Sequence, residues 1–95
     1  MKSPIRIFRV ADKSMEPSLL SGDYIFVNGR SQKINVGDVV VMRHPNKNIY
    51  IVKRVREISN DKFYLMGDND GESEDSRRFG ALERSKLVGK LIFKI

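Results

Sequence analysis

The sequence predicts a small, mainly β domain, built as an antiparallel β-barrel or a sheet folded on itself. Short runs rich in β-branched and aromatic residues recur along the chain, and turn residues separate them. Apolar residues almost nowhere recur at helical spacing. A chain of 95 residues has the length of one domain, so we expect residues 1–95 to form a single unit.

Turn residues delimit the predicted strands. Gly22-Asp23 and Gly37-Asp38 precede the second and third strands, and Asn60-Asp61 joins the fourth to the fifth. Asn28-Gly29 follows the second strand and is a strong hairpin signal, because both residues tolerate positive φ. A single helical turn is predicted at 82–86. The predicted strands are 5–11, 24–28, 39–43, 49–58, 62–66 and 87–94.

Two stretches do not fit this strand pattern. Residues 12–21 contain Pro17 and several small polar residues, and residues 67–80 are rich in Gly, Asp, Asn, Ser and Arg. A long polar loop is uncommon in so small a domain and is often functional. We therefore look for the functional residues in and around these two loops.

The composition excludes several classes of site. The chain has no cysteine, which rules out disulfides, zinc–thiolate sites and cysteine nucleophiles. Its single histidine, His44, cannot build a multi-histidine metal site. We therefore expect no metal and no cofactor.

The charge and hydropathy patterns bear on partners and location. The net charge is +6, but no Lys/Arg block exceeds two residues, so we expect no obligatory nucleic acid. No segment approaches the ~20 apolar residues of a membrane helix, and no signal peptide follows Met1 and Lys2. As written, the chain is predicted to be soluble and cytoplasmic. Peripheral membrane contact, through a missing anchor or a partner, stays open, and the oligomeric state is unknown.

Lys53 stands out in the fourth predicted strand. Alternation places Ile49, Ile51, Lys53 and Val55 on one face, which is apolar except for the lysine. Burial would lower the pKa of its ammonium group, and a neutral lysine can act as a general base. On the strand alone, a lysine whose stem covers the core while its head reaches water is the more common explanation.

Ser14 lies just after the first predicted strand, on a bend shaped by Pro17. A serine on such a bend can present its hydroxyl outward, with backbone N–H groups nearby for an oxyanion. Serine needs an adjacent base to become a nucleophile, and lysine is the available alternative to the single histidine. Read alone, the segment is better explained by a serine that only caps or stabilises a turn.

Three motifs, taken together and in this order, resemble the signal peptidase I family of Ser-Lys proteases. Ser14 to Leu19 match the nucleophile segment Ser-Met-x-Pro-Ser/Thr-Leu, and Lys53-Arg54-Val55 match the strand with the base. Residues 67–80 match the late loop: Gly-Asp-Asn, three spacers, Ser-x-Asp-Ser-Arg, then an aromatic residue and Gly. The resemblance runs from about Ile5 to Lys90, and it implies the signal peptidase catalytic-core fold, here as one minimal peptidase domain.

The resemblance implies a serine endopeptidase in which Ser14 attacks the scissile carbonyl and neutral Lys53 takes its proton. The backbone N–H of Ser14 would be one oxyanion donor. Asp12 departs from the family pattern, which often has serine or glycine at this position. As an anion it would repel a developing oxyanion, so we expect it to point away, toward Lys13, or the oxyanion hole to use other donors.

The resemblance also implies supporting roles. Ser73 would orient the lysine, Asp75 and Arg77 would form a structural ion pair, and Met15 would help line the substrate pocket. The residues expected to shape and brace the fold are Arg54, Asp68, Asn69 and Phe79.

The chain most resembles the short, soluble branch of nickel-type superoxide dismutase maturation proteases, which share Arg43-His44-Pro45 before Val52 to Val55. In that branch the protease removes an N-terminal leader peptide from its protein substrate. Two alternatives stay open. One is a membrane-anchored secretory signal peptidase I whose anchor is absent here; the other is a non-catalytic basic β-module that binds peptide or nucleic acid.

Overall fold

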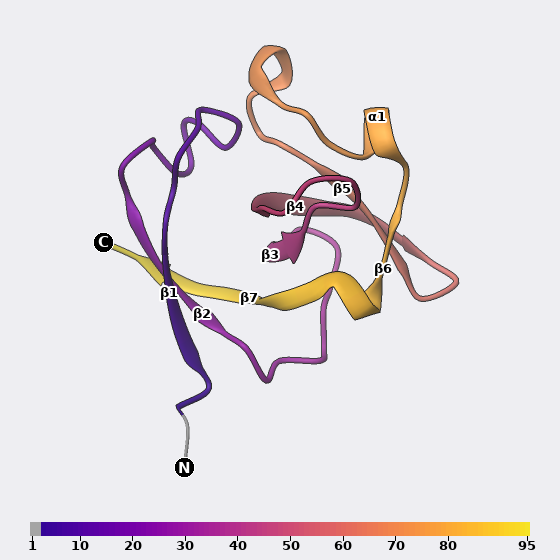
Figure 1. The fold of residues 1–95 in the computed structure, drawn as a ribbon, viewed down its shortest axis with the longest axis horizontal. Coiled ribbons are helices and arrows are strands. Elements are labelled where there is room, and N and C mark those ends of the chain that lie inside the picture. Colours follow the sequence, from indigo (N-terminus) through magenta and orange to yellow (C-terminus); the bar gives the residue numbers. More distant parts are fainter. Residues whose placement is uncertain (1–2) are drawn as a thin grey trace.

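The structure, a computed structural model that describes residues 3–95, is one curled antiparallel sheet (Figure 1). Its helical elements are α1 Ser76–Phe79 and two 3-10 turns, Asp70–Glu72 and Arg84–Lys86. Its strands are β1 Ile5–Arg9, β2 Tyr24–Asn28, β3 Val39–Arg43, β4 Tyr50–Ser59, β5 Lys62–Met66, β6 Leu82–Glu83 and β7 Leu87–Lys94. The seven strands lie in the order β1-β2-β7-β3-β4-β5-β6, and the mainly β prediction is confirmed. Met1 and Lys2, included in the predicted unit, lie outside the described residues.

Strand β3 contributes alternate residues to two apolar cores. Val39 and Val41 face the first core, while Val40 and Met42 face the second, so four consecutive residues are buried. The first core consists of Val10, Met15, Leu19, Ile25, Val27, Val39, Val41 and Val88. The second core consists of Ile34, Val40, Met42, Ile51, Val55, Phe63, Leu65 and Leu82.

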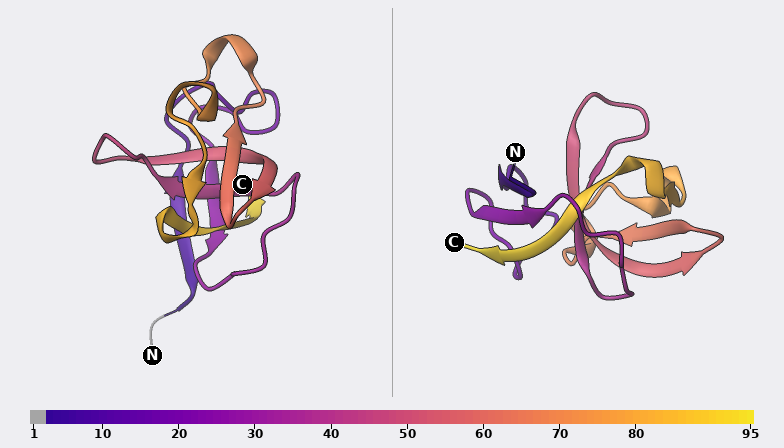
Figure 2. Two further views of the ribbon diagram at one scale, coloured as in Figure 1. Left: turned by 90° about the vertical axis from the view of Figure 1, so that its right-hand side faces the viewer. Right: turned by 90° about the horizontal axis from the view of Figure 1, so that it is seen from below.

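The two loops singled out from the sequence lie at the same end of the sheet. The first loop, residues 10–23, joins β1 to β2, and the late loop, residues 67–81, follows β5. Both lie at the end of the sheet away from the start of β1, as Figures 1 and 2 show in two views. The sheet thus brings segments about 50 residues apart to one place, where Asn69 N–H donates to the Ser14 carbonyl at 2.9 Å.

Most of the predicted strands agree with the structure. The bounds of β2, β3, β5 and β7 match, β1 ends two residues earlier at Arg9, and β4 is shifted by one residue. Asn60 and Asp61 both have positive φ, as the predicted tight turn between β4 and β5 requires. No helix within residues 3–95 has the length and apolar character that a membrane crossing requires.

Three local predictions were wrong or incomplete. Asn28-Gly29 does not form a hairpin, because β2 pairs with β1 and β7 rather than with the next strand, and Gly29 N–H donates to Pro4. The helical turn predicted at 82–86 is only Arg84–Lys86, since Leu82–Glu83 pairs with β5 as β6. Helix α1 was missed because a four-residue helix is too short to show helical periodicity.

Candidate active site

Ser14 is held inside the first loop by the loop's own packing. Val10 and Gly22 close the loop base through backbone hydrogen bonds, and Met15 and Leu19 anchor the turn in the first core. The Ser14 residue is 2% exposed, so little of its surface reaches solvent in this structure. Met15 is fully buried, and its side chain supports the turn from the core side.

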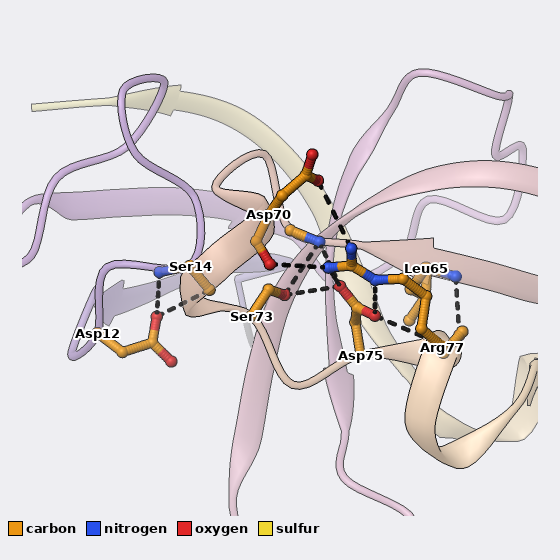
Figure 3. A network of polar contacts seen from close by, with 9 residues as sticks. Asp12, Ser14, Leu65, Asp70, Ser73, Asp75 and Arg77 are labelled. Carbon is orange, nitrogen blue, oxygen red and sulfur yellow. Dashed lines mark hydrogen bonds and ion pairs between the residues drawn. The ribbon is translucent and has the colours of Figure 1, made fainter.

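Asp12 points at Ser14 rather than away from it. One carboxylate oxygen, Oδ1, accepts the Ser14 hydroxyl at 2.8 Å and the Ser14 backbone N–H at 3.0 Å (Figure 3). Of the two expectations for Asp12, the one that it turns away toward Lys13 is therefore wrong. The other, that the oxyanion hole uses other donors, stays a prediction. The Asp12 carboxylate accepts hydrogen bonds from the two Ser14 groups, the hydroxyl and the backbone N–H, that a serine peptidase would use as nucleophile and oxyanion donor.

Lys53 lies at the edge of the second core. It is 2% exposed and sits in β4 between Ile51 and Val55, as alternation predicted. Burial lowers the pKa of its ammonium group. Asp12, Asp75 and Glu74 oppose this lowering by attraction, and Arg77 adds to it by repulsion.

The Lys53 ammonium has no hydrogen-bond partner among residues 3–95. In the same part of the chain, every fully buried side-chain nitrogen or oxygen does have one. It follows that the small exposed fraction of Lys53 includes Nζ, so its amine lies where the core meets solvent. A lysine in this position is available to a bound molecule and is biased toward its neutral form.

The late loop is organised around the buried carboxylate of Asp75, which is 0% exposed (Figure 3). Asp75 accepts hydrogen bonds from the Arg77 guanidinium at 2.9 Å, the Ser73 hydroxyl at 2.7 Å and the Gly67 N–H at 2.9 Å. Burial by itself would raise the pKa of Asp75, but these donors outweigh it and hold the pKa far below the ordinary range. Ser73 thus bonds to Asp75, and its hydroxyl makes no hydrogen bond to Lys53 within residues 3–95.

A second ion pair ties three segments together behind Ser14. Asp68 of the late loop accepts Arg54 Nε and Nη2 of β4 at 2.9 and 2.8 Å, and the Ser18 hydroxyl of the first loop at 2.6 Å. Hydrogen bonds from Arg54 lower the pKa of Asp68 and raise that of Arg54. Asn69 adds a bond from its side-chain amide to the Lys13 carbonyl at 2.9 Å. The strand with the lysine and the loop with the serine are therefore held in one fixed relation.

Sequence reasoning did not find the contacts of His44, Ser18 and Gly67. His44 is buried in the β3–β4 loop, where its Nδ1 accepts the N–H groups of Asn46 and Lys47 and its Nε2 faces Glu74 at 3.3 Å. It organises a loop and lies with Phe79 in an edge-to-face ring contact. Each of the three lies in a motif noted in the sequence, but a motif does not show which atoms its residues contact.

Gly67 is where the two loops meet, and we expect Gly67→Ala to be strongly destabilising. A Cβ there would lie 2.5 Å from the Ser14 carbonyl oxygen and 2.6 Å from Ser73 Cβ, too close for either to remain in place. We expect the free energy of unfolding to fall by about 1–3 kcal/mol, measured by urea denaturation. Gly71→Ala is the matched control in the same loop, since nothing lies within 4 Å of its added methyl group. Equal stability of the two variants would contradict the packing described.

Comparison with known proteins identifies the family. The profile of the Peptidase S24-like family matches residues 2–92. The chain belongs to this family. Three relatives each have the name signal peptidase complex catalytic subunit SEC11. The protein of Scheffersomyces stipitis is 43% identical over 90 residues, which cover 93% of this chain and 53% of the relative.

The two other relatives agree with this match. The Zygosaccharomyces rouxii protein is 42% identical over 73 residues, covering 72% of this chain and 42% of the relative. The Lodderomyces elongisporus protein is 38% identical over 92 residues, covering 95% and 54%. The chain spans about half the length of the curated relatives it matches. These matches confirm the predicted signal-peptidase-like family.

Proposed function

We propose that this domain is an endopeptidase that removes N-terminal leader peptides, with Ser14 as nucleophile and Lys53 as general base. The observation that carries the proposal is the setting of Lys53. It is a buried lysine of lowered pKa, without a hydrogen-bond partner among residues 3–95, in the field of Asp12, which itself bonds to Ser14. This setting suits a general base, which has to be neutral at the working pH and able to accept a proton from a neighbouring group.

In the proposed reaction, the Ser14 hydroxyl turns from Asp12 to Lys53 and attacks the scissile carbonyl carbon. Its proton passes to neutral Lys53 Nζ, and the resulting ammonium then protonates the leaving amine. This leaves the leader peptide as an ester on Ser14 Oγ. Lys53, again neutral, takes a proton from the water that hydrolyses the ester, and returns it to Ser14.

The remaining candidate residues act on this pair from a distance. The Asp75–Arg77 ion pair holds Ser73 and Gly67 in place, and Gly67 packs against the Ser14 carbonyl. Asp75 also attracts the Lys53 ammonium across the site. In this proposal Ser73 orients Lys53 once the hydroxyl of Ser14 has moved, and Met15 helps to line the substrate pocket.

The substrate is proposed to be a protein with an N-terminal leader peptide. The signal peptidase I resemblance implies small residues at the first and third positions before the cut. A cavity of about 390 Å³ beside the end of β1 is lined by Arg9, Val10, Ala11, Ser21 and Gly22, next to the residues that lead to Ser14, and offers room for them. The Arg43-His44-Pro45 segment favours the precursor of a nickel-type superoxide dismutase as the substrate.

The relatives also suggest where cleavage takes place. They are named as catalytic subunits of a signal peptidase complex, and each extends well beyond the region matched here. A membrane-bound complex that processes secretory leaders is therefore the alternative setting for the same reaction. Cleavage assays with a dismutase precursor and with a secretory precursor, run side by side, distinguish the two substrates.

Ser14→Ala is expected to abolish cleavage of a leader-bearing substrate, because alanine has no hydroxyl to attack the scissile carbonyl. Cleavage is followed by mass spectrometry of the released leader. Ser59→Ala is the control, since Ser59 is exposed at the end of β4 and does not line the proposed substrate cavity. Cleavage that persists in Ser14→Ala would remove Ser14 from the mechanism.

A further inference from the structure

The contacts of Asp12 are not explained by the mechanism above. Its Oδ1 atom takes both the hydroxyl and the backbone N–H of Ser14, at 2.8 and 3.0 Å. The Ser14 hydroxyl has no other hydrogen-bond partner within residues 3–95. One anionic oxygen thus holds both the proposed nucleophile and the proposed oxyanion donor.

We propose that Asp12 is a positioning residue that latches the resting site by holding both Ser14 groups until the substrate displaces it. This inference rests on the proposed Ser14–Lys53 mechanism. A backbone N–H that already donates to a carboxylate cannot also donate to the carbonyl oxygen of a scissile bond at full strength. A hydroxyl that donates to Asp12 also directs its proton away from Lys53. Both contacts must therefore open before attack.

The burial of the two residues makes such a latch reversible. Ser14 is buried, whereas Asp12 is exposed, so the carboxylate can swing into water without a large desolvation cost. Water then replaces its hydrogen bonds, and the substrate carbonyl takes over the freed N–H. Hydrogen bonds to a carboxylate are stronger than those between neutral groups. The latched form is thus favoured until a substrate carbonyl arrives.

The test compares Asp12→Ala, which has no acceptor, with Asp12→Asn, which keeps an uncharged oxygen at the turn. We expect kcat/KM for a leader peptide to rise about tenfold in Asp12→Ala and less in Asp12→Asn, because a neutral acceptor holds Ser14 more weakly. Asp23→Asn is the control. Like the Asp12 variants, it removes one negative charge from the first loop. It also weakens a hydrogen bond within a turn, from the Leu20 N–H to the Asp23 carboxylate at 2.8 Å, but it does not contact Ser14.

The pH profile separates the latch from the electrostatic effect of Asp12 on Lys53. The charged groups acting on Lys53 are Asp12, Asp75, Glu74 and Arg77, and loss of Asp12 lets the Lys53 pKa fall further. That effect alone moves the acidic limb of kcat/KM to lower pH and leaves the alkaline plateau, where Lys53 is neutral in every variant, at the same height. The latch in addition raises the plateau. A plateau that is unchanged or lower in both variants would overturn it.

Two measurements keep this result distinct from a failure of the proposed function. The first is the rate at which a serine-directed fluorophosphonate labels Ser14, which needs no peptide substrate and is expected to rise in Asp12→Ala. The second is the Ser14 amide proton resonance, which is expected to move upfield as its bond to a carboxylate is lost. If no variant cleaves leader peptides, the proposed function fails, and the labelling rates still decide the latch. If cleavage occurs but the plateau does not rise in either variant, the latch alone is overturned.

Discussion

Replacing Lys53 by methionine is expected to lower the rate of leader cleavage by at least about a thousandfold while the domain stays folded. Methionine has a similar length and an apolar surface suited to the second core, but it cannot accept a proton. The rate is measured with a leader peptide at the alkaline plateau, where wild-type Lys53 is neutral. Lys62→Met, an exposed lysine on β5, is the control and is expected to cleave at the wild-type rate.

The same variant is expected to keep or raise the free energy of unfolding. Burial lowers the pKa of Lys53 in the folded chain, so above that pKa the folded state binds fewer protons than the unfolded state. Stability of the wild type therefore gains a rising component with pH that ends near the ordinary lysine pKa of about 10.4. Urea titrations between pH 7 and pH 10 are expected to show this component in the wild type and to lack it in Lys53→Met. A variant that is both destabilised and active would assign Lys53 a structural role.

Replacing Asp75 by alanine is expected to have the largest effect on stability, about 3–5 kcal/mol. The carboxylate is fully buried, and its removal leaves the Gly67 N–H and the Ser73 hydroxyl without their acceptor and Arg77 without its partner. Loss of the late-loop structure also separates Gly67 from Ser14, so cleavage is expected to fall as well. The free energy of unfolding at pH 7 measures the first effect.

Asp70→Ala is the control, because the Asp70 side chain is 82% exposed and its ion pair with Arg77 is long, at 3.6 Å. The acid dependence gives a second check. The pKa of Asp75 is far below its ordinary value in the folded chain, so its stabilisation is complete above about pH 4 and declines as the pH falls further. The stability difference between wild type and Asp75→Ala is therefore expected to narrow between pH 5 and pH 3. If the stability difference between the two proteins stayed constant from pH 5 to pH 3, the charged Asp75 carboxylate would not be the source of the stabilisation.

The strands of this fold are readable from the sequence because apolar residues alternate and turn residues bound them. Four strands match in both bounds, and the alternation in β4 places Lys53 on the core side. The pairing of those strands was not readable. Asn28-Gly29 suggested a local hairpin, but long-range pairing of β2 with β7 prevailed, and a turn dipeptide carries no information about a strand 60 residues away.

The candidate site was readable only in part. Motif spacing predicts which residues gather, and the structure shows two neighbouring polar groups, Asp12 with Ser14 and Ser73 with Asp75 (Figure 3). Side-chain orientation was not readable, because it depends on which partner wins a hydrogen bond. Asp12 prefers the donors of Ser14 to those of Lys13, and Ser73 prefers Asp75. Such choices depend on distances of a few tenths of an ångström, which spacing along the chain does not encode.

The four consecutive apolar residues of β3 do not by themselves determine the register in which this strand pairs with its neighbours. Because Val39 to Met42 would fill either core almost equally well, their alternation cannot tell the strand which way to slide against its neighbours. Polar contacts at the start of the strand supply that information: Gly37 and Asp38 exchange backbone hydrogen bonds with Val55, and Arg54 Nη1 donates to the Gly37 carbonyl at 2.7 Å. The guanidinium that clamps Asp68 thus also sets the register of β3 against β4. Without the Arg54 guanidinium, β3 could slip along β4 and still bury its apolar residues. Ser14 and Lys53 would then no longer be aligned with each other.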